Sequence, residues 1–234
     1  MEHRFLMNNL YTFGCSNTRG DALDDIWDST TKNSFPQGDG YYPSKYAWPQ
    51  LLADKLNLNC INCGTSGASN KEIWHKLVTT DINKNDTVVV QWTFIDRYYV
   101  IDGKQYNTDN QILPWKGHRP TTMDQRDKRQ LARNDAFYEF LHTDTDVLYD
   151  VNLRIAHADL YAKQQGFKIF HITCIVEGNT IGIQLLPFNH TNILKPNIQR
   201  TVFETKSYAN DNGHPGILAH KIHADNIYNE IFKK

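Results

Sequence analysis

Two small residues with reactive side chains, Cys15 and Ser16, follow the first apolar run of the chain directly. Far along the chain, Asp211 and His214 stand three residues apart in the turn Asp-Asn-Gly-His-Pro. Acyl transfer needs a hydroxyl nucleophile, an imidazole that takes its proton and a carboxylate that orients the imidazole. Ser16, His214 and Asp211 are therefore a candidate nucleophile, base and orienting acid. Cys15 is the rival nucleophile, but the residue before Ser16 is expected to point away from it, into the packing between sheet and helices.

Acyl transfer also requires hydrogen-bond donors for the oxyanion, and two further segments offer them. Gly67 ends the turn Gly-Thr-Ser-Gly that follows a second short apolar segment. A glycine there lets the backbone approach a substrate closely and present its N–H. Thr93 directly follows the β-branched run Thr87–Trp92. The candidate oxyanion donors are therefore the backbone N–H groups of Ser16 and Gly67 and the side chain of Thr93.

Strand and helix patterns alternate along the chain. Strands are expected at residues 4–14, 58–62, 87–92 and 168–176, and helices at 48–56, after the capping residue Ser69, within about 121–165, and at 216–232. This alternation favours an α/β fold with a mostly parallel sheet covered by helices on both faces. Because ligands bind beyond the carboxyl ends of parallel strands, residues 14–16, 64–67 and 92–93 are expected at one edge of the sheet. No repeat or linker divides the chain, so a single domain is predicted over residues 1–234, with a loop and helical insertion at about 100–165.

Three stretches, taken in order, resemble sequence blocks of the SGNH (GDSL-type) hydrolases. They are Phe13-Gly14-Cys15-Ser16 for the first block, residues 62–70 for the second, and Asp211-x-x-His214-Pro215 for the last. The resemblance implies a flavodoxin-like three-layer α/β/α fold and a serine esterase or acyl hydrolase. It implies Ser16, His214 and Asp211 as the catalytic triad, and Ser16, Gly67 and Thr93 as the oxyanion hole. An O-acyl group on a carbohydrate, or a small ester, would be the substrate, and neither a metal nor an organic cofactor is implied.

The third block departs from that family, which usually has Gly-x-Asn-Asp where this chain reads Gln91-Trp92-Thr93-Phe94. Either Thr93 replaces the asparagine donor, or Gln91 or a loop residue supplies it, or the activity is low. The Gly-Cys-Ser opening and the Gln-Trp-Thr block resemble a divergent branch associated with phage and environmental sequences. The alternative function is therefore a catalytically weak or inactive binding or virion-associated protein of the same fold.

Four residues near the third strand are candidate substrate contacts: Asn70, Trp92, Asp96 and Arg97. Asp96 and Arg97 could bind a polar or anionic group, although a surface ion pair is the simpler explanation. Trp92 could line a cleft or belong to the core. A flavodoxin-like nucleotide binder is a weaker alternative, because no glycine-rich phosphate loop follows the first strand.

The composition excludes several classes of partner. The 234 residues carry 25 basic and 26 acidic side chains, a net charge of -1, which gives no basic patch for nucleic acid. No apolar run reaches the ~18 residues of a membrane span, and no signal-peptide pattern is read at the start, so we expect a cytoplasmic protein. The ten histidines show no metal-ligand spacing, and Cys60 and Cys63 would point to opposite faces of a strand. Oligomeric state is left open.

Overall fold

The computed structural model describes residues 8–32, 42–94, 97, 132, 135–136, 139–140, 143–174 and 192–232. Its strands are β1 (Asn9–Phe13), β2 (Asn59–Asn62), β3 (Thr87–Trp92) and β4 (Lys168–Thr173). Its helices are α1 (Ser16–Arg19), α2 (Trp48–Leu56), α3 (Asn70–Thr79), α5 (Asp144–Gln165), α6 (Ile198–Thr205) and α7 (Ile217–Phe232). Asp96 and the loop at 100–120 lie outside the described residues.

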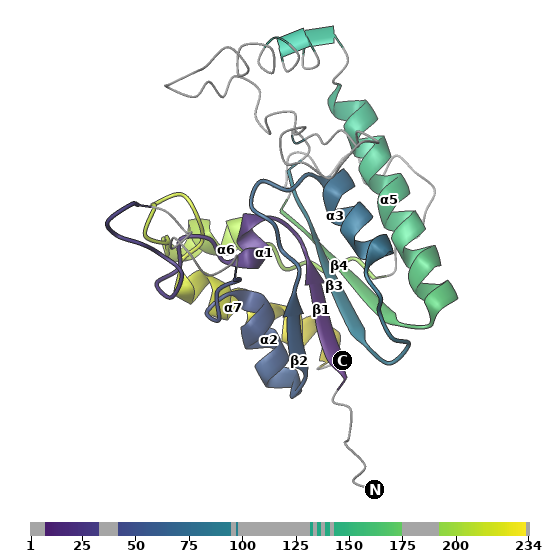
Figure 1. Ribbon diagram of the computed structural model, residues 1–234, viewed down its shortest axis with the longest axis horizontal. Helices are drawn as coiled ribbons and strands as arrows, with labels where there is room; N and C mark the ends of the chain where they lie inside the picture. The colour runs from purple at the N-terminus through teal and green to yellow at the C-terminus, as the bar shows by residue number, and fades with distance from the viewer. Residues whose placement is uncertain are drawn as a thin grey trace, which may run out of the picture.

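The four strands form one parallel sheet in the order β2-β1-β3-β4. Leu10 of β1 lies opposite Cys60 on one side and Thr87 on the other, and β3 pairs with β4 along its whole length. Helices α2 and α7 cover one face of the sheet, and α3 and α5 cover the other (Figure 1). The expected three-layer α/β architecture is confirmed, and the ends of β1, β2 and β3 lie side by side at one edge.

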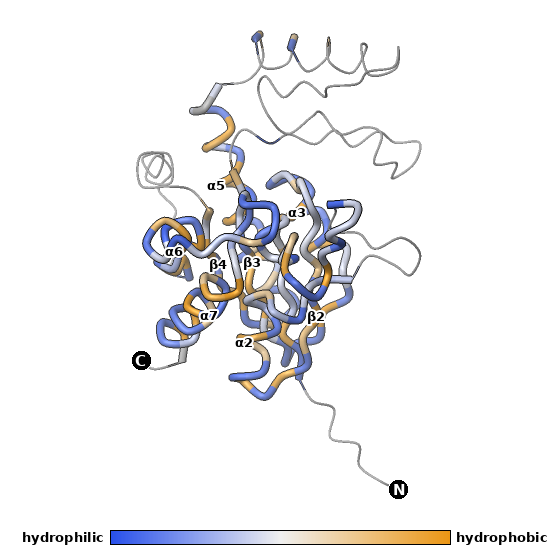
Figure 2. Tube along the Cα trace, turned by 90° about the vertical axis from the view of Figure 1, so that its left-hand side faces the viewer, coloured by the Kyte–Doolittle hydropathy of each residue, from blue (hydrophilic) through white to orange (hydrophobic). Residues whose placement is uncertain are grey.

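Each face of the sheet has its own hydrophobic core, because successive strand residues point to opposite faces. Val88, Val90 and Trp92 pack with α3 and α5, whereas Val89 packs with α2 and α7. Figure 2 shows the matching mixture of apolar and polar residues along the helices that cover the sheet. Cys63 packs against the core on the α3 and α5 side, and Cys60 packs against the core on the α2 and α7 side. The two thiols thus lie on opposite faces of the sheet, as expected.

Two helices, α1 and α6, are absent from the sequence-based expectation. With four and eight residues, they are too short to show an apolar period clearly. The long helical stretch expected at about 121–165 contains α5, which begins at Asp144 after the capping residue Thr143. Across the described ranges, no helix combines the length and apolar character that crossing a membrane requires.

Candidate active site

Ser16 stands at the carboxyl edge of the sheet, as the first residue of α1. The chain leaves β1 at Phe13 and enters this short helix three residues later. Ser16 is 4% exposed there. Thr18 ties α1 to the end of β3, because its hydroxyl donates to Gln91 Oε1 at 2.6 Å. Cys15 is fully buried and belongs to the core beneath α3 and α5, which confirms that it points away from the edge.

Gly67 lies in the neighbouring loop between β2 and α3. Its backbone adopts φ +73°, the left-handed region that glycine enters without strain, and a Cβ built there would meet nothing within 4 Å. No described residue beyond the two chain neighbours of Gly67 therefore covers this side of the loop. The loop is held against the end of β1 by Thr65, whose N–H donates to the carbonyl of Gly14 at 3.0 Å.

Three groups that acyl transfer would use make no hydrogen bond with the described residues. They are the hydroxyl and the N–H of Ser16 and the N–H of Gly67. The Ser16 hydroxyl and two backbone donors, one at the start of α1 and one in the β2–α3 loop, could thus bind a carbonyl group.

Asp211 and His214 are directly paired, with 2.5 Å between the carboxylate Oδ2 and the imidazole Nδ1. The other carboxylate oxygen accepts the backbone N–H groups of Gly213 and His214 at 2.9 and 3.0 Å. Partial burial tends to raise the pKa of Asp211, but these hydrogen bonds outweigh it and lower the pKa from its ordinary value. Asp211 is therefore held as a carboxylate, which fixes the imidazole with Nε2 directed away from it.

The loop that carries this pair docks onto the segment that follows α1. The backbone N–H and the side-chain amide of Asn210 both donate to the carbonyl of Ala22, at 3.1 and 2.9 Å, and the amide also donates to Asp24. Ala22 and Ala209 share a small buried cluster. The fold thus brings the C-terminal Asp-His loop to the α1 end of the molecule, although no hydrogen bond joins Ser16 to His214 in the described part of the chain.

Thr93 is committed to internal contacts. It is fully buried, its N–H donates to Asn70 Oδ1 at 2.7 Å, and its hydroxyl accepts from Arg97 at 3.1 Å. These contacts use the Thr93 N–H and the hydroxyl oxygen, and its role as third oxyanion donor stays a prediction. Gln91 is also fully buried, with its Oε1 occupied by Thr18.

The candidate substrate contacts have internal roles as well. The amide of Asn70 donates to the carbonyl of Thr93 at 3.1 Å, so it clamps the end of β3 to the start of α3. Trp92 is 0% exposed and its indole N–H donates to His171 Nδ1, which places the ring in the core rather than in a cleft. Arg97 is 7% exposed and reaches Thr93 and Ala68, and Asp96 lies outside the described residues.

Sequence reasoning missed a buried ion pair behind the Gly67 loop. Arg19 and Asp21 lie 2.7 Å apart with side chains 1% and 8% exposed, and both contact the Ser66 hydroxyl. Charged residues in a loop pattern give no sign of burial, so no sequence signal marks this contact.

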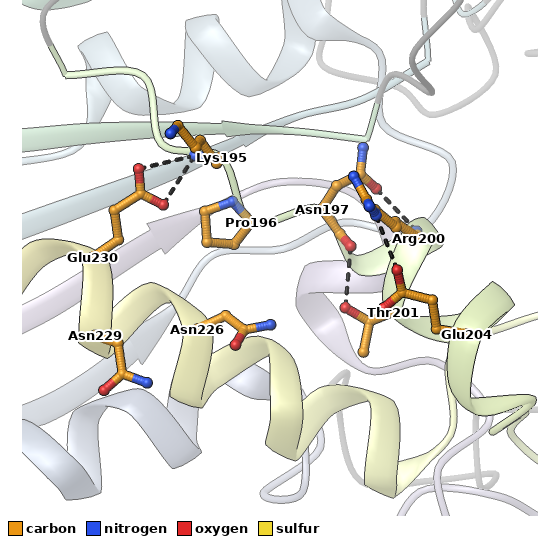
Figure 3. A pocket seen from close by; sticks show the side chains of 9 residues that line it. All are labelled: Lys195, Pro196, Asn197, Arg200, Thr201, Glu204, Asn226, Asn229 and Glu230. Carbon is orange, nitrogen blue, oxygen red and sulfur yellow. Dashed lines mark hydrogen bonds and ion pairs between the residues drawn. The ribbon is translucent and has the colours of Figure 1, made fainter.

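A hydrophilic groove lies elsewhere, between α6 and α7 (Figure 3). Glu230 accepts the backbone N–H of Lys195 across it, and Arg200 pairs with Glu204 at 2.9 Å. None of Ser16, Gly67, Asp211 and His214 lines this groove. Among the described residues, no cluster of three or more His, Cys, Asp or Glu side chains could hold a metal ion.

No protein-family model matches the sequence, and no curated protein matches it either. Solved structures match it in fold. The chain is similar to the lipase Lip_vut3 from a goat rumen metagenome, at 11% identity over 96% of this chain and 98% of that one, with a TM-score of 0.52. A carbohydrate esterase matches at 10% identity with a TM-score of 0.51, and the alignment covers 97% of this chain and 65% of that one.

A third structure, a lipolytic protein of the G-D-S-L family from Desulfitobacterium hafniense DCB-2, matches at 11% identity over 96% and 99% of the two chains, with a TM-score of 0.49. At such identities the likeness concerns the fold. The chain thus shares the fold of the lipase and of the carbohydrate esterase.

Proposed function

We propose that this protein is a serine-dependent ester hydrolase that uses Ser16, His214 and Asp211. The observation that carries the proposal is the 2.5 Å Asp211–His214 pair, docked by Asn210 onto the segment that follows α1. A carboxylate-fixed imidazole can act as the general base for a hydroxyl nucleophile, and Ser16 Oγ makes no hydrogen bond with the described residues. The shared fold with a lipase and a carbohydrate esterase supports the same class of reaction.

In the proposed reaction, Ser16 Oγ attacks the ester carbonyl while His214 Nε2 takes the hydroxyl proton. The tetrahedral oxyanion is stabilised by the N–H groups of Ser16 and Gly67. The imidazolium of His214, stabilised by Asp211, then donates its proton to the leaving alcohol as the carbon–oxygen bond breaks. A water molecule then attacks the acyl-enzyme carbonyl while His214 Nε2 takes its proton. The imidazolium gives that proton to Ser16 Oγ as the acyl–oxygen bond breaks, which restores the Ser16 hydroxyl and releases the acid.

The substrate class that we propose is an O-acyl ester of a carbohydrate or of a small alcohol. The outer side of Gly67 leaves room for an acyl group, because no described residue beyond its two chain neighbours lies within 4 Å of the position a Cβ would take. The carbohydrate esterase of similar fold supports a sugar as the alcohol part.

Hydrolysis of a chromogenic acetate ester tests the proposal. The wild type should turn over the ester, and Ser16→Ala should lower kcat by at least about 10³-fold, the usual scale for loss of a nucleophile. Ser29→Ala, at an exposed serine on a neighbouring loop, is the matched control and should leave the rate unchanged. Equal rates in the wild type and Ser16→Ala would remove Ser16 from the mechanism.

Binding without catalysis is the second candidate function, and the engaged state of Thr93 favours it. Thr93 stands where the SGNH family usually has its asparagine donor, and its hydroxyl is buried and accepts from Arg97. Three results together would support this second function: the protein binds an acetylated sugar, does not hydrolyse it, and does not react with a serine-directed phosphonate.

A further inference from the structure

Gly67, the proposed oxyanion donor, is bracketed by two buried arginines. Arg19 contacts the side chain of the residue before it, and Arg97 contacts the carbonyl of the residue after it. We propose that Arg19 and Arg97 are positioning residues that hold the Gly67 N–H at the oxyanion site. The inference rests on the proposed function.

Arg19 fixes the loop from the side of α1. Its Nη1 donates to Asp21 Oδ1 at 2.7 Å and to Ser66 Oγ at 3.2 Å, and its Nη2 donates to the carbonyl of Tyr42 at 3.3 Å. The Ser66 hydroxyl in turn donates to the second oxygen of Asp21. With Arg19 at 1% exposure, the three side chains form a closed network one residue away from Gly67.

The backbone of α1 and the backbone of this loop are also in direct contact. A Cβ on Gly64 would lie 2.6 Å from the backbone nitrogen of Arg19, so the two segments pack without room for a side chain. The amide of Asn62 donates to the carbonyl of Thr18 at 2.8 Å. Since Ser16 begins α1 and Gly67 ends the loop, these contacts set the distance between the two proposed oxyanion donors.

Arg97 fixes the loop from the side of β3. Its Nη1 donates to the carbonyl of Ala68 at 3.5 Å and to Thr93 Oγ1 at 3.1 Å, and its guanidinium lies 5.0 Å from the centre of the Phe94 ring. It therefore joins the segment after Gly67 to the segment after β3. In related hydrolases the second of these segments would carry the asparagine donor that this chain lacks.

The test compares Arg97→Met, Arg97→Lys and Ser66→Ala with the wild type in hydrolysis of a chromogenic acetate ester. Arg97→Met should lower kcat by about 10- to 100-fold with KM unchanged, the cost of a misplaced oxyanion donor. Arg97→Lys keeps the charge and should recover part of that loss. Ser66→Ala should lower kcat by about 10-fold, because it frees the loop and leaves the Arg19–Asp21 pair in place. Arg200→Met, on the exposed face of α6, is the control and should match the wild type.

Thermal unfolding of each variant separates positioning from stability. Loss of kcat in variants that remain fully folded at the assay temperature supports the inference. Unchanged kcat in folded Arg97→Met and Ser66→Ala overturns it, as does a loss that disappears when the assay is cooled to restore folding. If Arg97→Met fails to fold, Ser66→Ala decides by the same criteria. A wild type without Ser16-dependent hydrolysis overturns the proposed function itself, and that result is seen before any arginine variant is measured.

Discussion

The imidazole of His214 and the carboxylate of Asp211 are joined by a hydrogen bond of 2.5 Å, in a loop where both side chains keep about a third of their exposure. An asparagine at position 211 would keep the shape but lose the charge that stabilises the imidazolium. We expect Asp211→Asn to lower kcat/KM by about 10²- to 10⁴-fold. Asp24→Asn, which alters another carboxylate bonded to the same loop, is the control and should leave the rate unchanged. Ester hydrolysis by folded Asp211→Asn at the wild-type rate would exclude the pair from catalysis.

Gly67 and Gly64 should respond differently to alanine, although they lie three residues apart. At Gly67 the added methyl group meets open space, so Gly67→Ala should cost about 1 kcal/mol of stability, from the left-handed backbone alone. At Gly64 the methyl group would meet the backbone of Arg19 at 2.6 Å, so Gly64→Ala should cost about 3 kcal/mol or more. Urea unfolding of both variants measures the difference. Equal destabilisation would contradict the described loop geometry.

His220 and His223 make stability fall in acid. Burial lowers the pKa of both imidazoles to about 3. The charge of His214 lowers the pKa of His220 further, and the charge of His220 lowers the pKa of His223 further. The unfolded chain binds these protons near pH 6.5, the ordinary value, whereas the folded chain does not until about pH 3, so the free energy of unfolding falls as pH drops through that window. Each histidine should lower the free energy of unfolding by up to about 1.4 kcal/mol for every pH unit that the pH falls within this window.

Replacement of one histidine tests this account of the pH dependence. His223→Phe keeps an aromatic ring against Trp48, whose ring lies 5.7 Å away edge-on, and removes one titrating group. The slope of unfolding free energy between pH 7 and 5 should therefore decrease by up to about 1.4 kcal/mol per pH unit. An unchanged slope in urea unfolding would mean that His223 titrates normally in the folded protein.

Trp92 should matter for stability and not for substrate affinity. Trp92→Phe removes the indole N–H that donates to His171 Nδ1 at 3.1 Å and leaves a buried acceptor unsatisfied, so the expected loss is about 1–3 kcal/mol. Trp74 makes the same contact with His157 at 3.0 Å in a partly exposed position, so Trp74→Phe should cost less. A rise in KM with Trp92→Phe at unchanged stability would instead place the ring in a substrate cleft.

The sequence was sufficient to predict the layers of the fold and the edge where chemistry would occur. Two elements could be predicted from residues that are close in the sequence: the β-branched strand Thr87–Trp92 and the capped helix after Ser69. Hydrophobic periodicity and helix capping depend only on such neighbouring residues. Gly67 could be placed at the edge of a parallel sheet for the same reason. The last helix begins at Ile217, one residue after the expected start. The first strand was expected at 4–14 and is observed at Asn9–Phe13, with residues 4–7 outside the described ranges.

The remaining contacts depend on partners far apart in the sequence. Nothing near Arg19 indicates that its side chain is buried against Ser66, and nothing near Thr93 indicates that Asn70 and Arg97 already use its polar groups. Residue type and periodicity report which side chains are buried but do not identify their hydrogen-bond partners. The contacts that bury Thr93 could therefore not be predicted, and its role as an oxyanion donor stays a prediction.

Covalent labelling tests the assignment of Ser16 most directly. Wild-type protein is treated with a serine-directed fluorophosphonate, digested, and mapped by mass spectrometry, with Ser16→Ala and His214→Asn treated in parallel. We predict one adduct, on Ser16, that is absent in Ser16→Ala and forms far more slowly in His214→Asn. An adduct on Ser66 or another serine, or no adduct on Ser16 in protein that hydrolyses the ester, would contradict the assignment of Ser16 as the nucleophile.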